Sequence, residues 1–300
     1  MSVVSLPDLL AGAVRDRYAV GYFESWDVYS LEATIAAAEA EQSPVIIGVG
    51  GLSGNHDWLR ERGIDIYGGV SRRLAERADV PCAVLFNEAD SFAEAAGALG
   101  AGYNAVMMHT QGWPKERLLA DTATLTRAAH ALGIAVEGEV GALAEMGPGG
   151  EINDGVAAMT TVDEAAEFVR GTEVDCLAVA IGNVHFVTSD YQPTLDLGRL
   201  AELAAAVDVP LVLHGGSGVS ADQLHAAIAA GIAKVNFGTR LKDVFATELR
   251  AQLGSSNTDP NLVIGSRHEQ DICLAAARAL TIQIRELMVA LGSSGRGRRR

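Results

Sequence analysis

The chain has 300 residues, of which 49% are hydrophobic, 20% charged and 5% aromatic. This composition is too apolar for a disordered protein and is sufficient for a large buried core. Lysine and arginine number 23 against 38 acidic residues, and the formal net charge of −15 argues against electrostatic binding of nucleic acid. No apolar run approaches the roughly 18 residues that a membrane helix needs, and the first residues lack the basic flank of a signal peptide. We therefore expect a cytoplasmic protein without a membrane partner.

Eight short apolar segments recur along the chain, and segments of helical character lie between them. The apolar segments cover residues 19–25, 44–50, 82–88, 105–110, 135–141, 176–182, 210–216 and 234–240. Their nearly continuous hydrophobicity is typical of parallel strands that are covered on both faces. The clearest helical patterns cover residues 30–41, 91–99, 114–132, 161–169, 196–206, 221–230 and 271–291.

Eight successive strand-and-helix units predict an α/β fold, the (β/α)8 TIM barrel, as a single domain. A doubly wound sheet is the alternative, but it usually has fewer strands and a glycine-rich dinucleotide turn after the first. Here the first strand ends in Phe-Glu-Ser-Trp-Asp. We expect the barrel over residues 1–295 and a disordered, arginine-rich tail over residues 296–300, because no linker composition interrupts the alternation before it.

Extra length follows the second, fifth and eighth strands, in residues 51–69, 142–158 and 253–269, where barrel enzymes carry their active-site loops. The loop after the fifth strand contains Met-Gly-Pro-Gly-Gly-Glu-Ile-Asn-Asp-Gly. Its glycines and lack of apolar periodicity predict a mobile lid, with Glu151 and Asp154 as candidate acid–base groups. The alternative is a solvated loop whose acidic residues have no role.

Polar residues gather where the predicted strands end. They are Asn87 and Glu88 on the third strand, His109 on the fourth, Glu137 and Glu139 on the fifth, His185 after the sixth and His214 on the seventh. One histidine in an apolar run is more often a hydrogen-bonded core residue, but the carboxyl ends of barrel strands converge on one mouth. Imidazoles and carboxylates together there predict a divalent metal site. Zinc is the leading candidate, and Mn²⁺, Co²⁺ and Fe²⁺ are the alternatives.

Glycine-rich segments follow the seventh and eighth strands and predict a phosphate-binding site. Glycines let backbone N–H groups approach an anion, and hydroxyl groups and a following helix N-terminus add donors. The candidate residues are Gly182, Gly215, Gly216, Ser217, Asn236, Gly238, Thr239 and Arg240. For Arg240, contact with a second phosphate or a carboxylate and a salt bridge to a neighbouring helix are equally compatible with the sequence.

Several motifs together resemble the zinc-dependent class II fructose-bisphosphate and tagatose-bisphosphate aldolase family. They are YAVGYF, VEGEVG, GPGGEINDG, CLAVAIGNVH, VPLVLHGGSGV, KVNFGTRLK and LGSSG, spread from about residue 5 to residue 295. The resemblance implies a barrel enzyme that makes or cleaves a carbon–carbon bond beside the carbonyl of dihydroxyacetone phosphate. It also implies a metal that polarises the ketone, a sugar-phosphate substrate, and a homodimer or larger homo-oligomer.

By this resemblance, His185 and His214 are metal ligands, and Gly215, Ser217, Asn236 and Thr239 hold the phosphate. The family ends its third strand in His-x-Asp-His-Gly, where this chain has Leu-Phe-Asn-Glu-Ala. Asn87 therefore replaces the family's catalytic aspartate, and Glu88 replaces a histidine ligand.

The fourth strand carries the opposite exchange, since His109 stands where the family has an aspartate. Glu139 matches a family glutamate that can serve an alternative metal position. Because the two exchanges are reciprocal, we expect Glu88, His109, His185 and His214, with Glu139 nearby, to bind a metal.

Asn87 cannot act as a general base, because an amide does not exchange a proton at neutral pH. Either Glu88, Glu151 or Asp154 supplies that function, or the acceptor is not glyceraldehyde 3-phosphate. None of the three lysines, Lys115, Lys234 and Lys242, has an evident strand-end position in the mouth, which disfavours a Schiff base.

The sequence therefore predicts a metal-dependent aldolase, a carbon–carbon lyase that acts on a ketose phosphate or bisphosphate. Two alternatives remain open. One is a sugar-phosphate isomerase or epimerase that uses the same enediolate chemistry, and the other is a non-catalytic paralogue that binds a metabolite.

Overall fold

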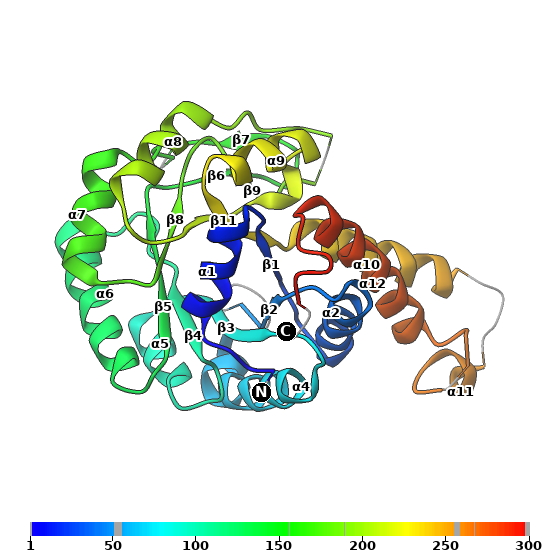
Figure 1. The fold of residues 1–300 in the computed structure, drawn as a ribbon. Coiled ribbons are helices and arrows are strands. Elements are labelled where there is room, and N and C mark those ends of the chain that lie inside the picture. The colour runs from blue at the N-terminus through cyan, green and yellow to red at the C-terminus, as the bar shows by residue number, and fades with distance from the viewer. Residues whose placement is uncertain are drawn as a thin grey trace.

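The computed structural model describes residues 2–50, 56–155, 157–188, 190–254, 259–266 and 268–297. Within these residues a closed barrel of eight parallel strands is surrounded by helices, which confirms the predicted (β/α)8 fold (Figure 1). Around the barrel the strands are β1 (Val20–Phe23), β11 (Ile232–Phe237), β10 (Leu211–Leu213), β8 (Cys176–Val179), β5 (Ala135–Val140), β4 (Ala105–Met108), β3 (Cys82–Ala89) and β2 (Val45–Ile47).

The helices that follow the strands form the outer layer. They are α2 (Val28–Glu41), α4 (Ile64–Arg77), α5 (Phe92–Ala98), α6 (Lys115–His130), α7 (Val162–Thr172), α8 (Leu197–Ala206), α9 (Ala221–Ala229), α10 (Thr239–Leu253) and α12 (Ile272–Ala290). Short elements are α3 (His56–Trp58), a π-helical turn over Leu59–Gly63, a 3-10 turn over Gly216–Gly218 and α11 (Pro260–Val263). None of the described helices is both long and apolar enough to cross a bilayer.

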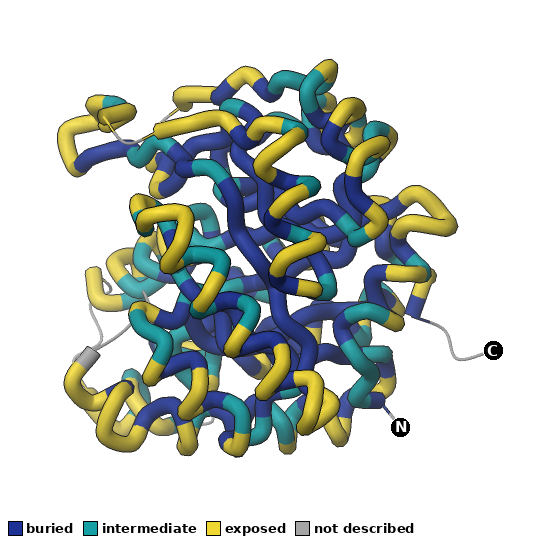
Figure 2. The backbone as a smooth tube through the Cα atoms, turned by 90° about the vertical axis from the view of Figure 1, so that its left-hand side faces the viewer, coloured by how far each residue is buried: buried dark blue, intermediate teal, exposed yellow. Residues whose placement is uncertain are grey.

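Helix α1 (Leu6–Asp16) precedes the first strand and closes the amino-terminal end of the barrel. Ser5 begins it by accepting a hydrogen bond from the Asp8 amide, and its buried leucines pack against side chains of the barrel interior. The barrel strands are buried along their length, whereas the surrounding helices expose their outer faces (Figure 2). With α1 covering one end, the opposite end is left as the place for a site.

Three parts of the chain differ from the sequence predictions. The segment 51–69 is helical from His56 onward where the structure describes it, because α4 is amphipathic and buries one face. The segment 142–158 contains β6 (Ala144–Met146) and β7 (Ile152–Asn153), which pair with β9 (Val184–His185) in a small sheet. The eighth strand ends at Phe237 rather than residue 240, because α10 begins at Thr239.

Two residues of the expected disordered tail have defined contacts. The Gly297 amide donates to the Gln42 carbonyl oxygen at 2.6 Å, and the Arg296 guanidinium lies 5.5 Å from the Tyr18 ring centroid. Residues 298–300 lie outside the described residues.

Gly48 permits the close approach of β2 and β3. Its φ is 152°, and a Cβ atom there would collide with the Leu85 carbonyl oxygen. We expect Gly48→Ala to lower the free energy of unfolding by about 1–3 kcal/mol. The Leu85 carbonyl group is part of the backbone, so it cannot move away from the new Cβ atom as the end of a flexible side chain could. Chemical denaturation measures this change.

Gly69→Ala is the matched control, since nothing lies within 4 Å of its Cβ position on the exposed face of α4. It should stabilise the protein by about 0.5–1 kcal/mol through helix propensity. Equal effects of the two substitutions would contradict the close approach.

Candidate metal centre

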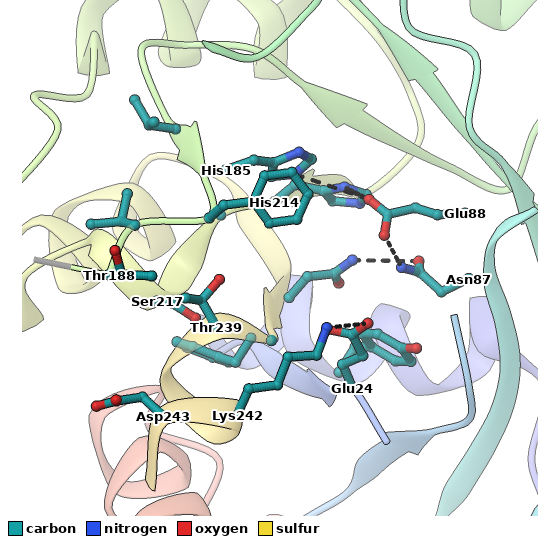
Figure 3. Close-up of a pocket in the computed structure, with 18 of the residues that line it drawn as sticks. Glu24, Asn87, Glu88, His185, Thr188, His214, Ser217, Thr239, Lys242 and Asp243 are labelled. Carbon is teal, nitrogen blue, oxygen red and sulfur yellow. Dashed lines mark hydrogen bonds and ion pairs between the residues drawn. The ribbon is translucent and has the colours of Figure 1, made fainter. Parts of the chain in front are cut away.

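Three side chains converge at the carboxyl end of the barrel (Figure 3). Glu88 comes from β3, His185 from β9, and His214 directly follows β10. Each residue offers one ligand atom, and these atoms all lie within 4.8 Å of one another. Glu88 Oε1 is 3.4 Å from His214 Nδ1 and 4.0 Å from His185 Nε2. One carboxylate and two imidazoles are thus within reach of a single ion.

The backbone of β3 turns Glu88 toward this cluster. The register between β3 and β4 shifts between Phe86 and Ala89, and Glu88 itself has a left-handed φ of 54°. A glutamate with that φ is under backbone strain, which tertiary contacts must offset. One such contact comes from Asn87, whose Nδ2 donates a hydrogen bond to Glu88 Oε2 at 2.9 Å.

Both the ring and the backbone of His214 are fixed by contacts with neighbouring side chains. Its Nε2 is 2.9 Å from Glu137 Oε1, a carboxylate on β5 inside the barrel. Its backbone carbonyl accepts a hydrogen bond from Asn183 Nδ2 at 3.0 Å. The His185 ring stacks on the His214 ring with a centroid separation of 5.9 Å.

The charges in the cluster shift its pKa values strongly. Burial opposes a charge on His214, but its hydrogen bond to Glu137 and the negative charges of Glu137 and Glu88 outweigh it and raise its pKa to about 9. Burial lowers the pKa of His185 to about 4. Burial would raise the pKa of Glu88, but the nearby histidines, His214 foremost, lower it to about 2. In metal-free protein, the proton on His214 therefore supplies the positive charge between Glu88 and Glu137.

Several buried polar atoms around the cluster lack hydrogen-bond partners within the described part of the chain. They are Nδ1 of His109, of His185 and of His214, and both carboxylate oxygens of Glu139. Unsatisfied buried polar atoms cost free energy and call for an explanation. Imidazole nitrogens and carboxylate oxygens are donors that zinc and related divalent ions accept. This donor set therefore fits a divalent metal.

His109 and Glu139 lie beside the cluster rather than in it. The Glu139 Oε1 atom is 4.0 Å from His214 Nδ1, and burial raises the pKa of Glu139. His109 follows β4, and its charge would be felt by both Glu88 and Glu139. Of the five predicted ligands, Glu88, His185 and His214 come together as one cluster among the described residues.

A cavity of about 370 Å³ extends from the cluster to the start of α10. Five predicted phosphate residues line it: Gly215, Ser217, Asn236, Gly238 and Thr239. At Gly215 φ is 68° and an added Cβ would collide with the Val184 carbonyl oxygen, so the turn requires glycine. The Arg240 amide donates to Ser217 Oγ at 3.2 Å, which joins the two predicted phosphate segments.

Three other predicted phosphate residues are not among those that line the cavity. Gly182, with a φ of 97°, and Gly216 are at close backbone approaches, to Thr194 and Asn236 respectively. The Arg240 side chain is not part of the lining either.

The sequence prediction did not name Lys242 and Arg250 as phosphate ligands, although both of these cations line the cavity. They share one face of α10 with Thr239, a spacing that could have identified them.

No lysine of the described chain lies at a strand end in the mouth, as the sequence predicted, although Lys242 reaches the cavity from α10. Lys242 lines the cavity and forms an ion pair of 3.1 Å with Glu24, which follows β1. Lys234 is fully buried within the barrel and lies 2.8 Å from Glu137 Oε2. A lysine within an otherwise apolar strand was the signal for an interior partner.

Glu151 and Asp154 are exposed, near β7, and are not among the residues that line the cavity. The segment that carries them contains paired strands. Its role as a mobile lid stays a prediction.

The chain is similar throughout its length to known proteins. A family model described as "Fructose-bisphosphate aldolase class-II" matches residues 4–296. A fructose-bisphosphate aldolase of Geobacillus stearothermophilus is 32% identical over 270 residues, covering 88% of this chain and 91% of the relative. A 6-phospho-5-dehydro-2-deoxy-D-gluconate aldolase of Shouchella clausii is also 32% identical, over 277 residues that cover 88% and 89% of the two chains. The crystal structure of the YdjI aldolase of Escherichia coli K12 is 27% identical, with a TM-score of 0.82 over 99% of this chain and 100% of that one.

The two cluster histidines should carry different charges in metal-free protein. With pKa values of about 9 for His214 and about 4 for His185, the first is cationic and the second neutral at pH 7. Nitrogen NMR of ¹⁵N-histidine-labelled protein measures both titrations. Because His214 must lose its proton to bind metal, zinc binding at pH 7.5 should release about one proton from it, detectable by calorimetry in buffers of different ionisation enthalpy.

Titration of both histidines near pH 6.5 would contradict this electrostatic description. A His225→Asn variant, altered at an exposed position on α9, identifies unrelated signals without changing the cluster.

Proposed function

This chain belongs to the class II fructose-bisphosphate aldolase family, and we propose that it is a metal-dependent aldolase acting on a ketose phosphate or bisphosphate. The metal is divalent, with zinc the leading candidate, and its ligands are Glu88, His185 and His214. The donor is dihydroxyacetone phosphate or a similar phosphorylated ketone. The observation that supports this most strongly is the three-residue cluster beside a cavity lined by glycine-rich, hydroxyl-bearing turns.

The chain's own residues have two tasks at this site. A divalent ion bound there would act as a Lewis acid that polarises a ketone and stabilises the negative charge formed on proton loss. Gly215, Ser217 and Thr239 would bind the donor phosphate through amide and hydroxyl groups, at the N-terminus of the 15-residue helix α10. Holding the donor at both ends limits its motion during carbon–carbon bond cleavage.

Asn87 would hold Glu88 rather than transfer a proton. Its amide group donates to Glu88 Oε2 and accepts from Asn236 Nδ2 at 3.4 Å. Among the described residues, the carboxylates that line the cavity outside the metal cluster are Glu24 and Asp243. Glu24 lies on the Asn87 side of the cavity and Asp243 on the far side (Figure 3). We assign the acid–base role at the acceptor hydroxyl to Glu24.

The same arrangement favours an acceptor other than glyceraldehyde 3-phosphate. Lys242 is neutralised by its ion pair with Glu24, which leaves less positive charge for a second phosphate. The relatives support variation in substrate, since aldolases named for two different substrates are each 32% identical to this chain. The predicted cytoplasmic location and homo-oligomer stay predictions.

Two alternatives use the same residues. An isomerase or epimerase would retain donor proton exchange and form no carbon–carbon bond. A non-catalytic metabolite-binding protein is favoured only by Asn87 and would show no exchange.

Exchange of a carbon-bound proton of dihydroxyacetone phosphate with solvent deuterium tests donor activation by NMR. We expect zinc-loaded protein to catalyse exchange and a chelator to abolish it. His214→Asn should reduce the rate by at least about 100-fold, because a Lewis acid contributes several kcal/mol. His225→Asn changes the same residue type on the surface and should have no effect. No exchange by metal-replete wild type would refute donor activation.

Glu24→Gln separates donor activation from acceptor chemistry. It should leave donor exchange within a few fold and slow condensation with glyceraldehyde, glycolaldehyde or glyceraldehyde 3-phosphate by about 10²–10⁴-fold. Product analysis by chromatography measures condensation and also detects isomerisation.

Asn87→Asp should not increase condensation, because it would bring a second carboxylate against Glu88 Oε2. The exposed Asn153→Asp change is its control. Strong activation by Asn87→Asp would indicate a decayed aldolase site and contradict the assignment of Glu24.

A further inference from the structure

A buried ion pair lies inside the barrel below His214. The Lys234 Nζ atom of β11 is 2.8 Å from Glu137 Oε2 and 3.0 Å from Glu137 Oε1. Both side chains are 0% exposed. Cys176 Sγ, 3.6 Å from Glu137 Oε2, is another neighbour of the carboxylate. Neither charged residue lines the cavity, so neither is placed to react with substrate.

Glu137 determines which nitrogen of His214 faces the metal cluster. An ionised carboxylate only accepts hydrogen bonds, so His214 Nε2, at 2.9 Å, must carry the proton of that contact. The Nδ1 atom is then the nitrogen left for a ligand, and it is the one 3.4 Å from Glu88 Oε1. A carboxylate behind a histidine ligand fixes both the ring orientation and the tautomer.

Lys234 is also connected to Glu88 through a series of side-chain hydrogen bonds. Its Nζ also donates to Asn236 Oδ1 at 2.6 Å. The Asn236 Nδ2 atom donates to Asn87 Oδ1 at 3.4 Å, and Asn87 Nδ2 donates to Glu88 Oε2 at 2.9 Å. A continuous series of side-chain contacts therefore runs from one candidate ligand, through the buried ammonium group, to another.

Stability alone does not explain this pair. Removing two charges from water costs free energy that their attraction only partly returns, and well-packed apolar residues of similar volume are often equally stable. The Tyr22 ring also lies beside the pair, with its centroid 5.3 Å from Lys234 Nζ. The pair is instead connected by hydrogen bonds to two candidate metal ligands, His214 and Glu88.

We propose that Lys234 and Glu137 are positioning residues that orient His214 and Glu88 for metal binding. This inference rests on the metal site of the proposed function. It assigns the buried lysine a structural task toward the ligands and no covalent chemistry.

The test is a double variant, Lys234→Met with Glu137→Leu, which replaces the pair by apolar side chains of similar size. We expect its free energy of unfolding without metal to change little, because losing the Glu137 contact with His214 and the Lys234 contact with Asn236 offsets the gain from removing two buried charges. Its dissociation constant for Zn²⁺, measured by competition with a chromophoric chelator, should rise 10–100-fold. The Co²⁺-loaded protein should show a changed visible spectrum, which a purely structural role would not produce.

Arg285→Met with Glu41→Leu is the matched control. It removes a 2.8 Å ion pair that links α12 to the end of α2, and it should leave the zinc dissociation constant unchanged. If the double variant in the barrel does not fold, Lys234→Met with Glu137→Gln removes both charges while keeping a polar side chain beside His214, and its zinc affinity should also fall. Wild-type protein that binds no zinc overturns the metal site itself. Zinc binding by wild type with equal affinity in a folded Lys234 or Glu137 variant overturns the positioning role alone.

Discussion

The imidazole of His214 lies between two carboxylates, Glu137 inside the barrel and Glu88 at its mouth. The rest of the site depends on this contact, because closure of the parallel barrel brings β3, β5 and β10 together in one interior. Charges at such depth must be paired or bound to a metal. Lys234 compensates Glu137 within the barrel, whereas Glu88 and the free nitrogen of His214 face the cavity, where a cation can complete the set.

This separation of charges is compatible with the proposed binding of a phosphate by an acidic protein. The formal net charge of −15 does not oppose binding if the anion is recognised locally by amide and hydroxyl groups. Gly215 and Thr239 belong to that local lining. The turn at Gly215 has a positive φ, which glycine adopts without strain. On the opposite side, one of the two cations that line the cavity, Lys242, already has a carboxylate partner.

The sequence predicted the barrel and its mouth well, because continuous apolar strands and strand-end histidines are local signals. His185, His214 and Glu88 were named from their strand-end positions and from the family resemblance, and the structure brings them within one cluster. No helix was predicted over α1, α4 or α10, although each of the three buries one face. The roles of Lys234 and Glu24 could not be predicted, since each depends on a partner, Glu137 or Lys242, that is distant in sequence and adjacent only after barrel closure.

Anomalous diffraction from zinc-soaked crystals tests the central claim most directly. We expect one anomalous peak within bonding distance, about 2.0–2.2 Å, of His214 Nδ1, His185 and the Glu88 carboxylate. We also expect His214 Nε2 to remain hydrogen-bonded to Glu137. No peak at the barrel mouth, or a zinc ion bound through His214 Nε2, would contradict it.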